Sequence, residues 1–158
     1  MGLKNVIPMI PFCRTIKEAK EVVALMKTYG LNRDKEKDLE IIMMCEIPSN
    51  VILTDEFLDI FDGMSIGSND LTQLVLGLDR DSEIVSKVGN ENNAAVKKQI
   101  AQVIATCKKR GKYIGICGQA PSDYLEFTRF LVENNIDSIS LNPDAVMKTL
   151  PRIAKYES

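Results

Sequence analysis

Five polar residues lie at or just after the ends of apolar runs, at positions where a buried strand would end. In chain order they are Glu46, Ser68, Asn69, Asp70 and Cys117. The two carboxylates can coordinate one hard cation such as Mg²⁺ and leave positions open for substrate oxygens and water. Gly67 lets the backbone approach a ligand closely, and the amides of Asn69 and Asp70 open the next helix, where they would attract an anion. These residues therefore predict a site for a divalent cation and a small carboxylate or phosphate ester.

Simpler structural explanations exist for several of these residues. Asp70 and Gln73 match a capping box, and the spacing by itself favours that role for Asp70. Cys117 is also explained as a small buried hydrophobe. Glu46 is harder to explain in this way, because a carboxylate that ends a long apolar strand has to be paired, coordinated or solvated.

Five short apolar runs predict the strands that position these residues. They span 5–12, 39–47, 63–67, 113–117 and 138–141. The second and fourth runs are almost continuously apolar, which is typical of strands buried on both faces in a parallel sheet.

Helical patterns with recognisable ends lie between the apolar runs. Thr15 and Glu18 form a capping box before the first helix, and Gly30 follows its end. Asn93 begins a helix that stops before Gly111. The remaining helical segments are predicted at 49–61, at 122–134 and after Asn142–Pro143.

The alternation of strands and helices predicts one α/β domain, over residues 1–158, with a parallel sheet. Two architectures fit it: an open doubly wound sheet, or part of an eight-stranded (β/α) barrel. No glycine-rich phosphate loop follows the first strand, which disfavours a dinucleotide fold. Both architectures bind ligands at the carboxyl ends of the strands.

Composition excludes several classes of function. The net charge is −2, and no basic cluster extends beyond "KKRGK" at 108–112, so nucleic acid and anionic membranes are not expected partners. No apolar stretch approaches the ~20 residues of a membrane span, and no signal-peptide pattern is present. Four cysteines without a CxxC pair indicate reduced thiols and a cytoplasmic protein. The sequence has no histidine, which excludes a catalytic triad, a histidine-bound zinc and a phosphohistidine.

Six segments of the chain resemble, in the same order, the C-terminal part of the phosphoenolpyruvate (PEP) synthase family, which is related to pyruvate phosphate dikinase and to enzyme I of the bacterial sugar phosphotransferase system. The segments are "MIPFCRT" (9–15), "MMCEIPSN" (43–50), "FDGMSIGSNDLTQLVLGLDRDS" (61–82), "AAVKK" (94–98), "GKYIGICGQAPSD" (111–123) and "IDSISLNPDAV" (136–146). They cover nearly the whole chain. A single D-x-x-Q motif is weak, whereas "SIGSNDLTQ" followed by "GICGQ" is specific.

The resemblance implies a TIM-type (β/α)8 barrel that binds pyruvate or PEP with Mg²⁺, of which this chain would hold about five units. It implies that Glu46 and Asp70 bind the metal and, with Gly67, Ser68 and Asn69, contact the substrate. Cys117 would exchange the proton at C3 between pyruvate and its enolate. A thiol, with a reference pKa of ~8.5, suits that role without a histidine.

The resemblance also implies what this chain lacks. The family's reaction converts ATP, pyruvate and water to PEP, AMP and phosphate, and needs ATP-binding and phosphohistidine domains with no counterpart here. The expected function is therefore an enzyme component that is not active alone, or alternatively a non-catalytic binding or assembly module. The open edges of a partial barrel predict self-association, or a partner chain that supplies the rest of the barrel and the phosphohistidine domain. Arg14 and Arg80 match family positions without an assigned role.

Overall fold

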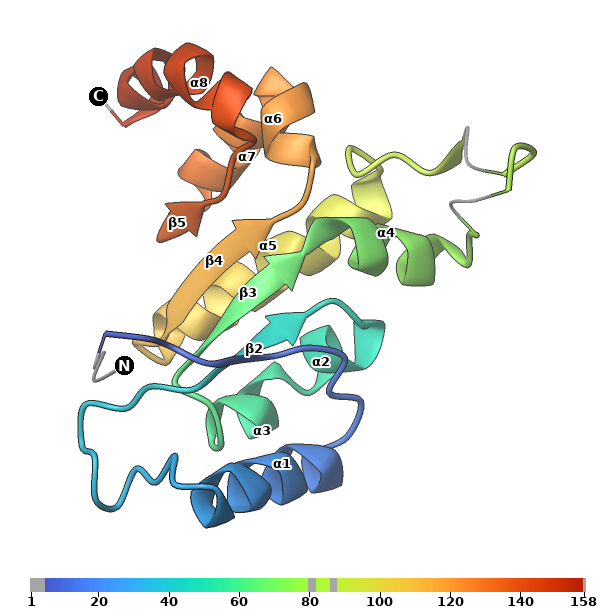
Figure 1. Ribbon diagram of the computed structural model, residues 1–158. Coiled ribbons are helices and arrows are strands. Elements are labelled where there is room, and N and C mark those ends of the chain that lie inside the picture. The colour runs from blue at the N-terminus through green and yellow to red at the C-terminus, as the bar shows by residue number, and fades with distance from the viewer. Residues whose placement is uncertain (1–4, 80–81, 86–87, 158) are drawn as a thin grey trace.

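A five-stranded parallel sheet forms the centre of the computed structural model, which describes residues 5–79, 82–85 and 88–157 and therefore not Arg80. Its strands are β1 (Met9–Ile10), β2 (Ile42–Cys45), β3 (Gly63–Gly67), β4 (Tyr113–Cys117) and β5 (Ser138–Ile139). They lie in chain order, each parallel to its neighbour, with β1 and β5 at the two edges. Figure 1 shows this open sheet with its helices. The α/β class and the series of five β/α units are confirmed.

Helices fill every connection between the strands, as the predicted alternation requires. They are α1 (Ile16–Thr28), α2 (Pro48–Ile52), α3 (Thr54–Leu58), α4 (Ser68–Leu76), α5 (Ala94–Lys109), α6 (Ala120–Asp123), α7 (Leu125–Glu133) and α8 (Pro143–Tyr156).

Several predicted helix ends are confirmed by their hydrogen bonds. The backbone amide of Glu18 donates to Thr15 Oγ1 at 3.1 Å, and the Thr15 amide donates to Glu18 Oε2 at 3.2 Å, which completes the capping box of α1. Gly30 follows the end of α1 with a φ of 103°, a conformation that favours glycine. At the start of α5, the Asn93 side chain accepts a hydrogen bond from the amide of Ala95 at 2.8 Å.

Five predicted elements have different bounds in the structure. The strands predicted at 39–47 and 138–141 are shortened to β2 and β5. The segment predicted at 122–134 is two helices, α6 and α7, because Tyr124 between them is extended with φ −119° and ψ 109°. The segment predicted at 49–61 is likewise divided into α2 and α3 at Leu53. The strand predicted at 5–12 is confined to β1, because Pro8 and Pro11 have no N–H for a ladder and Phe12 turns into the left-handed region with a φ of 47°.

The hydrophobic core lies between one face of the sheet and the helices that cover it. Alternate residues of the three central strands point into it and are buried: Met43, Cys45, Met64, Ile66, Ile114 and Ile116. Helix α5, which runs behind β3 and β4 in Figure 1, contributes the buried residues Val96, Ile100, Val103, Ile104 and Cys107. Because side chains alternate along a strand, the residues between these face the opposite side of the sheet.

Apolar side chains remain exposed at both edges of the sheet. On the β1 side, the exposed residues are Val6, Ile7, Met9 and Phe12. On the β5 side, a groove of about 700 Å³ lies between α7, β5 and α8, and its apolar lining includes Val132, Ile136, Ile139, Val146, Leu150 and Ile153. These are the two places where the next units of a closed barrel would pack.

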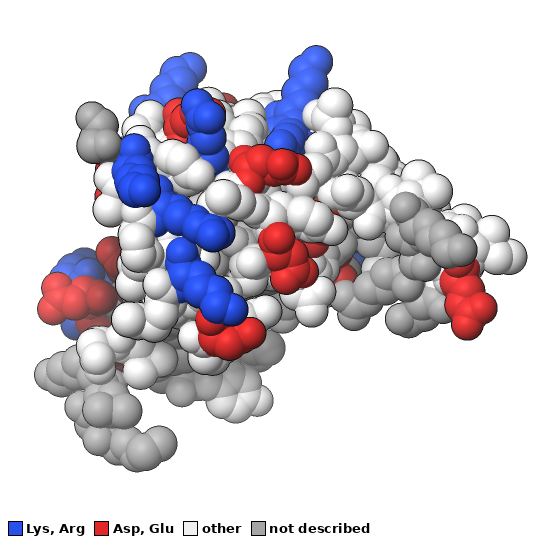
Figure 2. All heavy atoms as spheres, turned by 90° about the horizontal axis from the view of Figure 1, so that it is seen from above, with Lys and Arg blue, Asp and Glu red and all other residues white. Residues whose placement is uncertain are grey.

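Several charges on the surface form ion pairs. Within the predicted basic run at 108–112, Arg110 bonds Asp55 at 3.1 Å and Asp59 at 2.7 Å, and Lys108 pairs with Asp137. The face shown in Figure 2 mixes basic and acidic side chains. Among the described residues, no helix is both long and apolar enough to cross a membrane.

We expect substitutions of Phe57 and of the nearby Ile52 to change the free energy of unfolding by very different amounts. Phe57 on α3 is fully buried, whereas Ile52 on α2 is 72% exposed. We expect Phe57→Ala to lower the free energy of unfolding by about 3–5 kcal/mol, because it leaves a cavity. Ile52→Ala should lower it by about 0.5 kcal/mol or less. Urea denaturation followed by circular dichroism measures both, and equal losses would contradict this description of the core.

Candidate functional site

The register of the sheet brings predicted site residues from three strands to one edge. Gly67 pairs with Cys117, and Glu46 follows Cys45, whose partner on β3 is Ile66. The side chains of Glu46 and Cys117 therefore share the face of the sheet opposite the core. Asp70 lies close enough to both that its charge raises the pKa of each.

Glu46 is a buried carboxylate with two different surroundings for its two oxygens. Its side chain is almost inaccessible, since the residue is only 2% exposed. Oε1 accepts a hydrogen bond from the backbone amide of Phe12 at 2.8 Å. Oε2 lies beside Gly67, where an added Cβ would come within 2.9 Å of it. Burial raises the pKa of Glu46, the Phe12 amide lowers it, and the negative charge of Asp70 raises it further.

The structure rules out the capping-box role for Asp70. Helix α4 begins at Ser68, so Gly67 is its N-cap and Asp70 is its third residue. The carboxylate lies in the first turn, where a negative charge suits the helix dipole without capping it. Asp70 is half-buried and therefore still open to a ligand.

Ser68 and Asn69 occupy the first turn of α4, next to the end of β4. Ser68 is fully buried, and its Oγ has no hydrogen-bond partner within the part of the chain that the structure describes. The Asn69 side chain accepts a hydrogen bond from the Gln119 amide at 3.4 Å. A cavity of about 270 Å³ lies beside Asn69 and Gln119, but its lining does not include Glu46, Asp70 or Cys117.

Cys117 differs from the other thiols in being partly accessible. Cys13, Cys45 and Cys107 are buried, and burial raises the pKa of Cys107 to about 12. The pKa of Cys117 is also raised, first by burial and then by the charges of the two carboxylates, while a hydrogen bond with Ser65 lowers it. The explanation of Cys117 as a fully buried hydrophobe is therefore wrong.

The residues at this edge fit a magnesium ion that keeps part of its own coordination shell. Among residues 5–79, 82–85 and 88–157, no group of three or more His, Cys, Asp or Glu side chains is placed to hold a metal. Mg²⁺, however, is usually bound by one or two carboxylates with waters and substrate oxygens. Glu46 and Asp70 supply such a pair, and the negative charge of Asp70 raises the pKa of Glu46.

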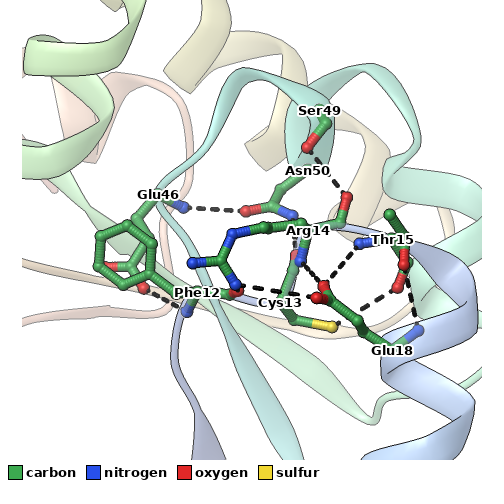
Figure 3. A network of polar contacts seen from close by, with 8 residues as sticks. All are labelled: Phe12, Cys13, Arg14, Thr15, Glu18, Glu46, Ser49 and Asn50. Atoms are coloured by element: carbon green, nitrogen blue, oxygen red, sulfur yellow. Dashed lines mark hydrogen bonds and ion pairs between the residues drawn. The ribbon is translucent and has the colours of Figure 1, made fainter.

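Sequence reasoning missed two residues that hold Glu46 in place. They are Phe12, which donates its amide to the carboxylate, and Asn50, whose side chain accepts from the Glu46 amide at 3.3 Å. Figure 3 shows both around Glu46. The signal available in the sequence was a polar Asn50 four residues after Glu46, near the start of a predicted helix. Nothing in the sequence indicated the backbone conformation of Phe12.

A family model and several curated relatives match this chain and agree on one enzyme family. The family model described as "PEP-utilising enzyme, PEP-binding domain" matches residues 2–158. The phosphoenolpyruvate synthase of Synechocystis sp. is 62% identical over 157 residues, which is 99% of this chain and 19% of that protein. Phosphoenolpyruvate synthases of Aquifex aeolicus and Escherichia coli are 58% and 56% identical over 157 residues, covering 18% and 20% of those proteins. The chain thus spans about a fifth of the length of these relatives.

A solved structure supports the fold. An HpcH/Hpal aldolase/citrate lyase family protein from Burkholderia cenocepacia matches with a TM-score of 0.63 and 18% sequence identity. The match covers 96% of this chain and 64% of that one. The neighbour has a TIM-barrel-type fold, and the open sheet of this chain is consistent with part of such a barrel.

The surroundings of Cys117 predict an unusual pH dependence of its alkylation. Since burial, Glu46 and Asp70 raise its pKa, its rate of reaction with iodoacetamide should keep rising above the pH at which an ordinary thiol levels off. Asp70→Asn removes one negative charge, so its profile should shift to lower pH. Mass spectrometry of the labelled peptides measures each thiol separately, with buried Cys107 as the slow control. An unshifted profile in Asp70→Asn would show that the two groups do not interact.

Proposed function

Because the chain belongs to the PEP-binding domain family of PEP-utilising enzymes, we propose that it is the pyruvate- and PEP-binding portion of a phosphoenolpyruvate synthase. The observation that carries the proposal is the meeting of Glu46, Asp70 and Cys117 at one edge of the sheet. Glu46 directly follows β2, Asp70 lies on α4 and Cys117 ends β4, so the fold rather than the local sequence brings them together. Two carboxylates and an accessible thiol suit cation binding and proton transfer.

Glu46 and Asp70 would hold Mg²⁺ in this proposal. The bound cation supplies positive charge that stabilises an enolate and its carboxylate. Gly67, Ser68 and Asn69 would contact the substrate, since they lie at the same strand end and Ser68 Oγ has no hydrogen-bond partner among the described residues. Gly67 also leaves room for the Glu46 carboxylate, which a Cβ at this position would displace.

Cys117 would move the proton at C3. Its raised pKa keeps the thiol protonated near neutral pH, so the S–H can give its proton to C3 of the enolate and produce the methyl group of pyruvate. In the reverse direction, the thiolate takes a proton from that methyl group. Neutralisation of the charges on Glu46 and Asp70 favours the thiolate, because those charges raise the pKa of Cys117.

The remaining parts of the reaction would come from outside this chain. The sequence has no histidine and so cannot form the phosphohistidine from which PEP receives its phosphoryl group. The exposed apolar residues beside β1 and the groove beside β5 need covering, which supports a partner that completes the barrel, or self-association. Four unpaired cysteines agree with the cytoplasm as the place of action.

The metal-dependent site is tested by calorimetric titration of the chain with oxalate, a mimic of the enolate, with and without Mg²⁺. We expect binding only with Mg²⁺, and an affinity at least about tenfold lower in Glu46→Gln or Asp70→Asn, because each loses a charged ligand. Glu56→Gln, an exposed carboxylate of α3, is the matched control and should leave the affinity unchanged. Binding that is independent of Mg²⁺, or unaltered in both site variants, would overturn the assignment.

The role of Cys117 is tested by the exchange of C3 protons of pyruvate with deuterated water, followed by nuclear magnetic resonance in the assembled enzyme. Cys117→Ala should reduce exchange by about 10²-fold or more while leaving oxalate affinity near that of the unaltered protein. Cys107→Ala removes a buried thiol of α5 and is the control. Undiminished exchange in Cys117→Ala would remove this thiol from the mechanism.

A further inference from the structure

The segment that follows β1 holds an aromatic residue in an unfavourable backbone conformation. Among the described residues other than glycine, only Phe12 and Asn135 have positive φ values, of 47° and 59°. Asn135 lies just after α7, where asparagine is a common helix terminator. Phe12 has no such reason, because bulky side chains disfavour the left-handed region. The residue is 40% exposed, so packing does not account for the conformation either.

The positive φ of Phe12 is explained instead by hydrogen bonds with Glu46, which follows β2, and with Asn50 of α2. The Phe12 amide donates to Glu46 Oε1 at 2.8 Å, and the carbonyl oxygen of the next residue, Cys13, accepts from Asn50 Nδ2 at 2.7 Å. Asn50 Oδ1 in turn accepts from the amides of Ile47 and Glu46, at 3.1 and 3.3 Å. Asn50 is fully buried, so these bonds are shielded from water. One side chain therefore joins the ends of β1 and β2, as Figure 3 shows.

A second set of contacts ties the same segment to α1. The Arg14 amide donates to Glu18 Oε2 at 2.7 Å, and Arg14 Nη1 donates back to the carbonyl oxygen of Phe12 at 3.2 Å. The Arg14 guanidinium lies 5.9 Å from the centre of the Phe12 ring, within reach of a cation–π contact. The left-handed turn at Phe12 is thus stabilised by contacts with Glu46 and Asn50 and by contacts with Arg14.

We propose that Phe12 and Asn50 are positioning residues, which hold the Glu46 carboxylate so that one oxygen is occupied and the other is presented to a cation. The inference rests on the proposed function, since the cation is the one assigned to Glu46 there. Oε1 is engaged by the Phe12 amide, while Oε2 lies beside Gly67 and the start of α4. A relaxed backbone at Phe12 would point its N–H elsewhere and leave a buried carboxylate free to turn.

A matched pair of variants separates the backbone of Phe12 from its ring. Phe12→Gly and Phe12→Val both remove the ring, but glycine accepts a positive φ and a β-branched valine resists it. With Mn²⁺ and oxalate as the probe, calorimetry should give Phe12→Gly a dissociation constant within about twofold of the unaltered chain. Phe12→Val should bind about tenfold more weakly. Equal dissociation constants for the two variants would overturn the proposal.

A second measurement needs no ligand and so separates this inference from the proposed function. Hydrogen exchange of the Phe12 amide should be slow in the ligand-free chain and about tenfold faster in Asn50→Ala, which releases the Cys13 carbonyl. Thr128→Ala is the control, because it deletes another buried side-chain hydrogen bond, to the Pro121 carbonyl, far along the chain. Exchange of the Phe12 amide in Thr128→Ala should stay slow.

Fast exchange of the Phe12 amide in the unaltered chain, or equal exchange rates in all three proteins, would contradict the positioning role. Failure of oxalate to bind the unaltered chain, with these rates as expected, would instead count against the proposed function.

Discussion

A buried carboxylate at the end of an apolar strand is the constraint on which this structure depends. Glu46 cannot be placed there without partners, because burial disfavours its charge and Asp70 disfavours it further. The Phe12 amide donates a hydrogen bond to one carboxylate oxygen of Glu46, and Gly67 lies beside the other oxygen. We propose that a divalent cation balances the negative charges of Glu46 and Asp70.

The same constraint explains why the surrounding elements are built as they are. Phe12 adopts a strained conformation to reach Glu46, and the buried Asn50 fixes that conformation by joining the ends of β1 and β2. Gly67 has no side chain because Glu46 and Met44 already fill the space that a Cβ would need. The positive φ of Phe12 and the crowding around Gly67 both lie at the carboxyl edge of the sheet, where parallel sheets bind ligands. The apolar core lies on the face of the sheet opposite Glu46 and Cys117.

The sequence was informative where structure follows from local rules. Continuous apolar runs located β2, β3 and β4, and the capping residues Thr15 and Asn93 located two helix starts, because both signals lie within a few adjacent residues. The spacing of Asp70 to Gln73 by itself suggested a capping box, because spacing does not show where a helix starts, and the structure places Asp70 inside the first turn instead. The divisions at Leu53 and Tyr124 were missed because neither is a glycine or proline. The turn at Phe12 could not be predicted from the sequence, since it depends on hydrogen bonds to residues more than thirty positions away.

The central claim is that Glu46 and Asp70 hold a cation against which a small carboxylate binds beside Cys117. The most direct test is a crystal structure of the chain grown with Mn²⁺ and oxalate, with anomalous scattering used to locate the metal. The account predicts one Mn²⁺ bound by both carboxylates, with oxalate next to Gly67, Ser68 and Asn69 and near the Cys117 sulfur. Mn²⁺ bound elsewhere, or an oxalate that avoids this edge of the sheet, would contradict it.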